Sequence, residues 1–186
     1  MTSRLNRLAV AFVATALATL GVTVANPSPA SAAMTICYNT SQAGSFAGTA
    51  NQAASIWNNA TSNLTLTANC GSNLRIYQIT GGGSYAVRTS LGNGRVYIDT
   101  QQAQQYSPLR IMTHEIGHIL GLPDNYNGDC ALLMSGGSAG TSCTNPYPST
   151  TEANRVTNLF AGTRSTDRAG SQIFRDSWPA TLTTVG

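Results

Sequence analysis

The stretch HEIGHILGLPD, residues 114–124, contains both histidines of this 186-residue chain. His114 and His118 are four positions apart, so on a helix their imidazoles lie on the same side, with Cβ atoms about 5–6 Å apart. Two imidazoles in this arrangement can reach one zinc ion, at Zn–N distances of about 2.0–2.1 Å. Glu115 falls beside the metal rather than on it, which is where a general base for the activated water is needed. The stretch therefore predicts the catalytic centre of a zinc hydrolase.

A catalytic zinc site needs a third protein ligand and one open position. Gly121 is expected to end the helix in a left-handed turn, so that the chain reverses and Asp124 comes within reach of the ion. A carboxylate is a suitable ligand, at about 2.0–2.2 Å. Glu152 is the alternative, but the pattern Ser149-x-x-Glu152 also forms a capping box at the start of a later helix. We predict Asp124 as the third ligand because Gly121 places the turn.

Hydrophobic periodicity divides the rest of the chain into short strands and a few helices. Amphipathic helices are expected at residues 45–59, 108–120 and 149–161. Strands are expected at residues 34–39, 64–68, 74–80, 85–89 and 95–99. Residues 125–149 are rich in Gly, Asn, Ser and Pro, and are expected to form a loop.

The first 33 residues have the pattern of a secretory signal peptide. Arg4 and Arg7 precede an apolar stretch at 8–25, and small residues at 30–33 form a cleavage site of the A-x-A type. A transmembrane helix is the alternative, but the stretch is rich in Ala, Gly and Thr and no basic cluster follows it. We expect secretion, with no membrane attachment after cleavage. The expected parts are a leader, a domain and a loosely ordered tail, at residues 1–33, 34–163 and 164–186.

The predicted domain is formally neutral. All ten basic residues of the chain are Arg, and residues 34–163 contain five Arg and five acidic residues. No basic stripe is present, which argues against nucleic-acid binding. The export signal and the even count of four cysteines favour disulfides. A four-cysteine zinc knuckle is excluded, because no two cysteines lie two to four positions apart.

The stretch at 114–124 resembles the snapalysins, small neutral zinc metalloproteases of the metzincin group that actinobacteria secrete. The likeness runs from about residue 35 to residue 162. Further similar stretches lie at residues 83–86, 101–106, 133–137 and 142–148. The resemblance implies an α+β, zincin-like fold, with a twisted mixed sheet of four or five strands and three main helices. It places the active-site helix under a substrate cleft.

The resemblance also implies roles for single residues. It implies zinc bound by His114, His118 and Asp124, with Met134 in a tight turn beneath the ion. Tyr126 would help to bind the oxyanion. The strand at 84–89 would form the upper edge of the cleft and pair with an extended substrate. The family favours Tyr or Phe just after the scissile bond and acts on proteins or peptides. Nothing in the sequence indicates more than a monomer, and a proteinaceous inhibitor is a further expected partner.

The resemblance also implies how two of the four cysteines pair. Cys130 and Cys143 match the family's disulfide, which by chain entropy would contribute about 3 kcal/mol. Cys37 and Cys70 form an additional pair, expected to tie the first strand to the end of the second.

The chain departs from the family pattern in three further respects. Snapalysins bind calcium just before the motif helix, but Ser107 and Leu109 stand at the ligand positions, so the calcium ligands are not retained. A long pro-segment is not expected between the leader and residue 35. The tail at 164–186 extends beyond the usual end of the family.

Two other functions compete with a secreted zinc endopeptidase. A catalytically silent binding module could keep the zincin fold, but it would be expected to lose Glu115, which is present. A zinc amidase acting on cell-wall peptides would usually lack the continuation from His118 through Gly121 to Asp124. We therefore favour the endopeptidase, with Glu115 as the general base.

Overall fold

The computed structural model describes residues 33–161 and 171–175, so nearly all of the predicted leader and most of the predicted tail lie outside the described residues. The helices are η1 (Gly44–Phe46), α1 (Ala47–Ala60), α2 (Thr100–Ala103), α3 (Pro108–Ile119), η2 (Leu133–Ala139) and α4 (Thr150–Ala161), where η marks a 3-10 helix. The strands are β1 (Met34–Gln42), β2 (Leu64–Ala68), β3 (Leu74–Ile79), β4 (Tyr85–Ser90), β5 (Asn93–Asp99) and β6 (Gln172–Arg175). Among the described residues, no helix has the length and apolar character needed to cross a membrane.

The strands form one mixed sheet in the order β2-β1-β3-β5-β4-β6. Neighbours from β2 to β5 run parallel, whereas β4 runs antiparallel to β5 and β6 runs antiparallel to β4. This arrangement confirms the α+β, zincin-like fold. The expectation of four or five strands is corrected to six, because a segment of the predicted tail joins the sheet beyond β4.

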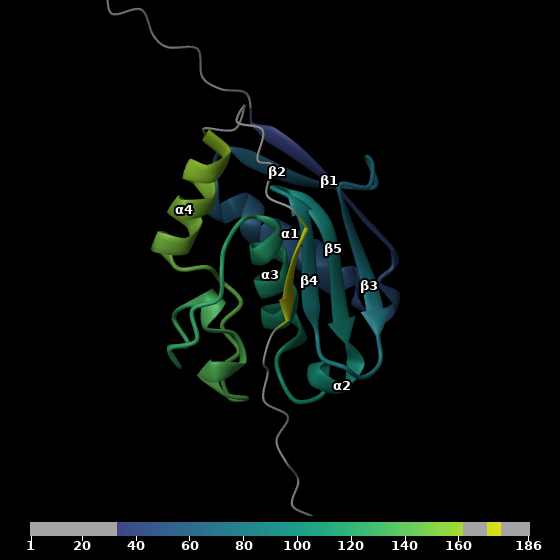
Figure 1. The fold of residues 1–186 in the computed structure, drawn as a ribbon, viewed down its shortest axis with the longest axis vertical. Coiled ribbons are helices and arrows are strands. Elements are labelled where there is room, and N and C mark those ends of the chain that lie inside the picture. The colour runs from purple at the N-terminus through teal and green to yellow at the C-terminus, as the bar shows by residue number, and fades with distance from the viewer. Residues whose placement is uncertain (1–32, 162–170, 176–186) are drawn as a thin grey trace, which may run out of the picture. The chain divides into compact units, whose positions relative to one another are not determined.

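Helices α1 and α3 pack against each other, and α3 packs on β4, β5 and η2 (Figure 1). Trp57 of α1 is fully buried, and its indole N–H donates a hydrogen bond to the carbonyl oxygen of Thr113 on α3, at 2.9 Å. Every residue of α3 from Arg110 to Ile119 is buried. The sequence predicts a helix with one apolar face; the structure surrounds that helix with protein, so its polar side chains are interior groups.

Both ends of α3 form as the sequence predicts. The Ser107 hydroxyl accepts a hydrogen bond from the backbone N–H of Arg110 at 3.4 Å, and Pro108 occupies the first turn. Gly121 ends the helix with φ at +103°. The N–H of Leu122 then bonds back to the carbonyl oxygen of Gly117 at 3.0 Å. This left-handed turn reverses the chain toward Asp124.

A buried carboxylate holds the start of β4. Asp99 is 2% exposed and accepts backbone N–H bonds from Gly81 at 2.8 Å and Gly83 at 2.9 Å. The same carboxylate caps α2 by accepting the N–H of Gln101 at 2.9 Å. The loop before β4 is therefore anchored to the end of β5.

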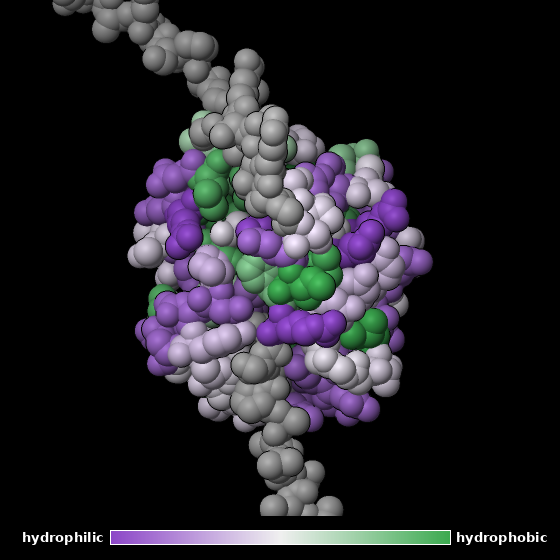
Figure 2. All heavy atoms as spheres, viewed as in Figure 1, coloured by the Kyte–Doolittle hydropathy of each residue, from purple (hydrophilic) through white to green (hydrophobic). Residues whose placement is uncertain are grey.

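Figure 2 shows an apolar area near the centre of the face on which Figure 1 shows β6.

Both expected disulfides are present and no cysteine is free. Cys37 on β1 bonds to Cys70, just after β2. Cys130 bonds to Cys143 across the segment that contains η2. The predicted pairing is confirmed at both bridges.

Candidate metal centre

Three side chains with metal-binding atoms meet at the end of α3. His114 and His118 come from the helix, and Asp124 comes from the loop after the Gly121 turn; one ligand atom from each lies within 4.8 Å of the others. The Oδ1 atom of Asp124 is 3.4 Å from Nε2 of His114 and 3.3 Å from Nε2 of His118. We call these residues the His-His-Asp group. The structure thus brings together the three residues that the sequence predicts as ligands.

Backbone carbonyls orient both imidazoles. Nδ1 of His114 lies 3.0 Å from the carbonyl oxygen of Leu133, and Nδ1 of His118 lies 2.9 Å from that of Leu122. A carbonyl oxygen only accepts, so each Nδ1 carries the hydrogen, and each Nε2 is turned toward Asp124. Metal-binding histidines are held in this way by their other ring nitrogen. The orientation and the donor set fit a zinc ion.

The group has a buried side and an accessible side. Both histidines are 0% exposed, whereas the side chain of Asp124 is 24% exposed. The Asp124 side chain therefore reaches the surface, while its Oδ1 atom and both Nε2 atoms, which face one another, are buried.

Glu115 lies one position beyond His114 and is completely buried. Its side chain lies in the protein interior, as do the two imidazoles on the same helix, α3. Tyr126, two residues after Asp124, is 43% exposed. Its side chain lies on the accessible loop of the site.

Glu152, the alternative third ligand, lies outside the group and holds the Met134 turn. Its carboxylate accepts the backbone N–H groups of Leu133 at 3.1 Å and Met134 at 2.8 Å. It also accepts the N–H and the hydroxyl of Ser149, at 2.7 and 2.8 Å. The predicted capping box is therefore present, and the same carboxylate joins α4 to the start of η2. The link to η2 is a contact that the sequence does not reveal.

Met134 lies directly against the active-site helix. A Cβ atom added to Gly117 would come within 2.9 Å of Met134 Sδ and 3.2 Å of Trp57. The carbonyl oxygen of Met134 also accepts the N–H of Asn125, next to Asp124, at 2.8 Å. The turn therefore touches both the helix that carries the histidines and the loop that carries the carboxylate.

Arg110 is a supporting residue that the sequence reasoning missed. It is 1% exposed and donates hydrogen bonds to the carbonyl oxygens of Asn145 at 2.6 Å and Leu132 at 2.8 Å, and to the Ser135 hydroxyl at 3.0 Å. Its position could have indicated this supporting role, because Arg110 precedes His114 by four positions and shares its side of the helix. The guanidinium fastens the segment around η2 to α3.

The positions of the family's calcium ligands serve other purposes here. Ser107 caps α3, and Leu109 packs against the hydrophobic core. The structure offers no further group of three His, Cys, Asp or Glu residues within its described part that could hold a metal ion.

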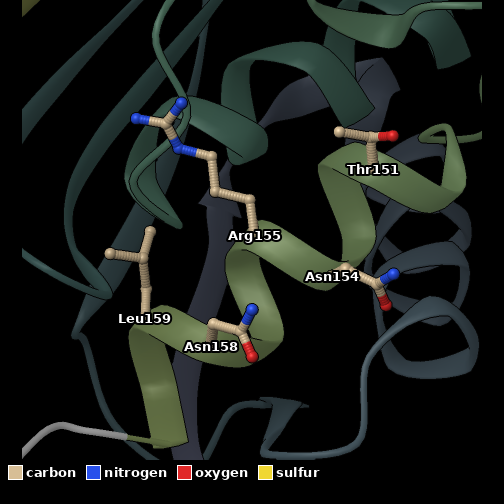
Figure 3. A pocket seen from close by; sticks show the side chains of 5 residues that line it. All are labelled: Thr151, Asn154, Arg155, Asn158 and Leu159. Atoms are coloured by element: carbon tan, nitrogen blue, oxygen red, sulfur yellow. The ribbon is translucent and has the colours of Figure 1, made fainter.

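The surface also has hollows beside α4. One of about 390 Å³ is lined by Asp124, Met134, Glu152 and Arg155 among others. Another, of about 520 Å³, is open and lies along α4 (Figure 3). Its described lining residues are Thr151, Asn154, Arg155, Asn158 and Leu159. None of these is a candidate ligand or base, so the larger hollow is not the candidate centre.

Replacement of Gly117 by alanine is expected to destabilise the fold by about 1–3 kcal/mol, the usual cost of overpacking a core. The added methyl group would press on Met134 Sδ, between the two histidine positions. Gly48→Ala is the matched control, because a methyl group added at that position on α1 would meet no atom within 4 Å. The control should be neutral or slightly stabilising. Urea unfolding of both variants measures the difference; equal stability would contradict the contact.

The mixed sheet over an enclosed helix, with two imidazoles on the helix and a carboxylate beyond a glycine turn, fits the zincin-like class of folds. The comparison with protein families identifies the family within that class. The chain belongs to the Streptomyces extracellular neutral proteinase (M7) family, which matches residues 33–163.

Relatives in Streptomyces support this assignment. The extracellular small neutral protease of Streptomyces lividans is 46% identical over 139 residues, covering 74% of this chain and 61% of the relative. That of Streptomyces caespitosus is 45% identical over 129 residues, covering 69% of this chain and 98% of the relative. The chain thus spans less than two thirds of the first relative and nearly all of the second. Both names include the word extracellular, which agrees with the predicted secretion.

Proposed function

We propose that this chain is a secreted zinc endopeptidase that hydrolyses peptide bonds in proteins or peptides. One observation carries the proposal: Nε2 of His114 and of His118 converge on the Asp124 carboxylate, at 3.4 and 3.3 Å. Both are oriented by backbone carbonyls. A bound zinc ion would supply Lewis acidity to the water and to the scissile carbonyl.

The proposed roles of the residues follow from their places. His114, His118 and Asp124 hold the ion. Glu115 acts as the general base, taking a proton from the attacking water and passing it to the leaving amine. Glu115 is completely buried beside His114. This burial supports the role, because bulk water does not screen the electrostatic attraction between its carboxylate and a nearby proton. Tyr126 is proposed to stabilise the oxyanion from the exposed loop.

The substrate is proposed to extend along β4. This strand borders α3, and the loop before it is anchored by Asp99. The side of β4 away from β5, which β6 pairs with in this structure, is proposed as the position for strand addition. A preference for Tyr or Phe just after the scissile bond is proposed from the family resemblance. A monomeric state and a proteinaceous inhibitor stay predictions, as does the loss of the family's calcium ligands at Ser107 and Leu109.

The test uses the purified chain from residue 34 to residue 186 and a quenched peptide with Tyr after the scissile bond. Cleavage before Tyr is expected, with loss of activity in a zinc chelator and recovery when zinc is restored. A peptide with Ala in place of Tyr is the control for preference. No cleavage by a folded, zinc-loaded chain would instead favour the binding module that keeps the zincin fold without catalysis.

A further inference from the structure

The strand β6 lies outside the part of the chain that matches the family. The family match ends at residue 163, and β6 spans Gln172–Arg175. It pairs antiparallel with β4, with Tyr85 opposite Arg175, Ala86 opposite Phe174 and Arg88 opposite Gln172. In the sheet order, β4 has β5 on one side and β6 on the other. The free edge of β4 is therefore occupied by this chain's own tail.

Phe174 carries β6 into contact with the candidate metal centre. Its ring stacks on the imidazole of His118, with centroids 4.4 Å apart and planes 11° apart. The guanidinium carbon of Arg88 lies 5.1 Å from the centre of the same ring. Phe174 is opposite Ala86, which is fully buried, and Phe174 is itself partly buried, so its ring faces the interior. An aromatic side chain of the tail thus covers the outer face of a predicted zinc ligand.

Arg88 joins the helix, β4 and the tail. Its Nη1 donates to the carbonyl oxygen of His118 at 3.0 Å, and its Nη2 donates to the side-chain oxygen of Gln172. On the other face of the sheet, the Arg175 guanidinium lies 4.8 Å above the ring of Tyr85. Tyr85 in turn stacks on Tyr97 at 4.4 Å. Side chains on both faces of the sheet therefore fix the register of β6.

We propose that residues 172–175 are an internal competitor of the substrate, occupying the strand position on β4 that an extended peptide would take. The inference rests on the proposed function, which places the substrate on β4. An edge strand offers one row of backbone N–H and C=O groups, so it pairs with one occupant at a time. The substrate can bind only when β6 has left.

The competition is expected to be reversible. The strand has only four residues, and Ile173, on the same strand, is 59% exposed. A tethered segment benefits from an effective concentration of the order of millimolar, without needing high intrinsic affinity. When only a fraction of the molecules is open, the apparent affinity for substrate falls by that fraction. We expect removal of the tail contact to raise kcat/KM about tenfold, as for a site that is about one-tenth open.

The kinetic test compares Phe174→Ala with Ile173→Ala in the chain from residue 34 to residue 186. Phe174→Ala removes the stack on His118, so KM for the quenched peptide should fall about tenfold with little change in kcat. Ile173→Ala shortens an exposed side chain of the same strand and should change KM much less. Equal KM values for Phe174→Ala and the unchanged chain would overturn the proposal. A fall in kcat in place of the fall in KM would also overturn it.

A binding test is independent of turnover. It uses a chain ending at residue 163 that carries Glu115→Gln, together with a synthetic peptide of residues 168–178. Such a chain is expected to fold, since it contains the whole region that matches the family, residues 33–163. Calorimetry should detect binding of the peptide, weakened when the peptide has Ala in place of Phe174. No binding would overturn the proposal.

The two tests separate the competition from the proposed function. Cleavage by every variant with the same KM, and no peptide binding, would overturn the competition alone. Absence of cleavage by every zinc-loaded variant would overturn the proposed function. In that case peptide binding alone decides whether β4 accepts the tail.

Discussion

The Glu115→Gln variant is expected to keep its fold and its zinc but to lose about 10²- to 10⁴-fold in kcat, the usual contribution of a general base. Glutamine has nearly the shape of glutamate, so the enclosed helix α3 should pack unchanged. Its amide has no basic oxygen that can hold the proton of the attacking water. Because the side chain at position 115 is completely buried, a carboxylate dissolved in the solvent cannot take the place of Glu115 as the base.

The measurement combines kcat on the quenched peptide with the zinc content and the thermal unfolding midpoint. Unchanged zinc and an unchanged midpoint are the controls, because they show that the loss lies in chemistry. Turnover close to that of the unchanged chain would mean that another group is the base. Loss of zinc together with activity would mean that Glu115 supports the ligands instead.

The Asp124→Ala variant is expected to lose zinc. Changes in the outer partners of metal ligands already cost about 10- to 100-fold in metal affinity, and loss of a direct ligand should exceed this. The two histidines would remain in place, because Leu133 and Leu122 orient them independently of Asp124. Zinc content after dialysis against a weak chelator measures the effect.

Glu152→Ala is the matched control for Asp124→Ala. Glu152 holds the backbone N–H groups of Leu133 and Met134, so its loss leaves buried donors without their acceptor, at roughly 1–3 kcal/mol for each donor. The expected result is lower stability with zinc still bound at one ion per chain. The opposite pattern, full zinc in Asp124→Ala and loss of zinc in Glu152→Ala, would exclude Asp124 as the third ligand.

Local periodicity predicted most of the secondary structure. The expected strand at 64–68 agrees with β2 at both ends, and the expected motif helix agrees with α3 to within one residue. The prediction of a loop at 125–149 is wrong for its middle part, which forms the 3-10 helix η2. The helix α2, with four residues, is too short to show a period and was not predicted.

The tail shows where prediction from pattern stops. Residues 172–175 have no run of alternating apolar residues long enough to indicate a strand, and β6 forms because β4 supplies an edge and His118 supplies a surface for Phe174. The remainder of the tail lies outside the described residues, so its predicted loose order stays a prediction.

The sequence by itself determined the His-His-Asp group, because its geometry is local. Two histidines four positions apart share a side of any helix, and a glycine turn three residues later brings the carboxylate back. Only the tertiary structure decided which groups support that centre: Glu152 on the Met134 turn, Arg110 on η2, and Phe174 on His118. These partners are 18, 25 and 56 positions apart along the chain, as their residue numbers show. Contacts at such separations depend on how the sheet and loops fold back onto α3, which no local period encodes.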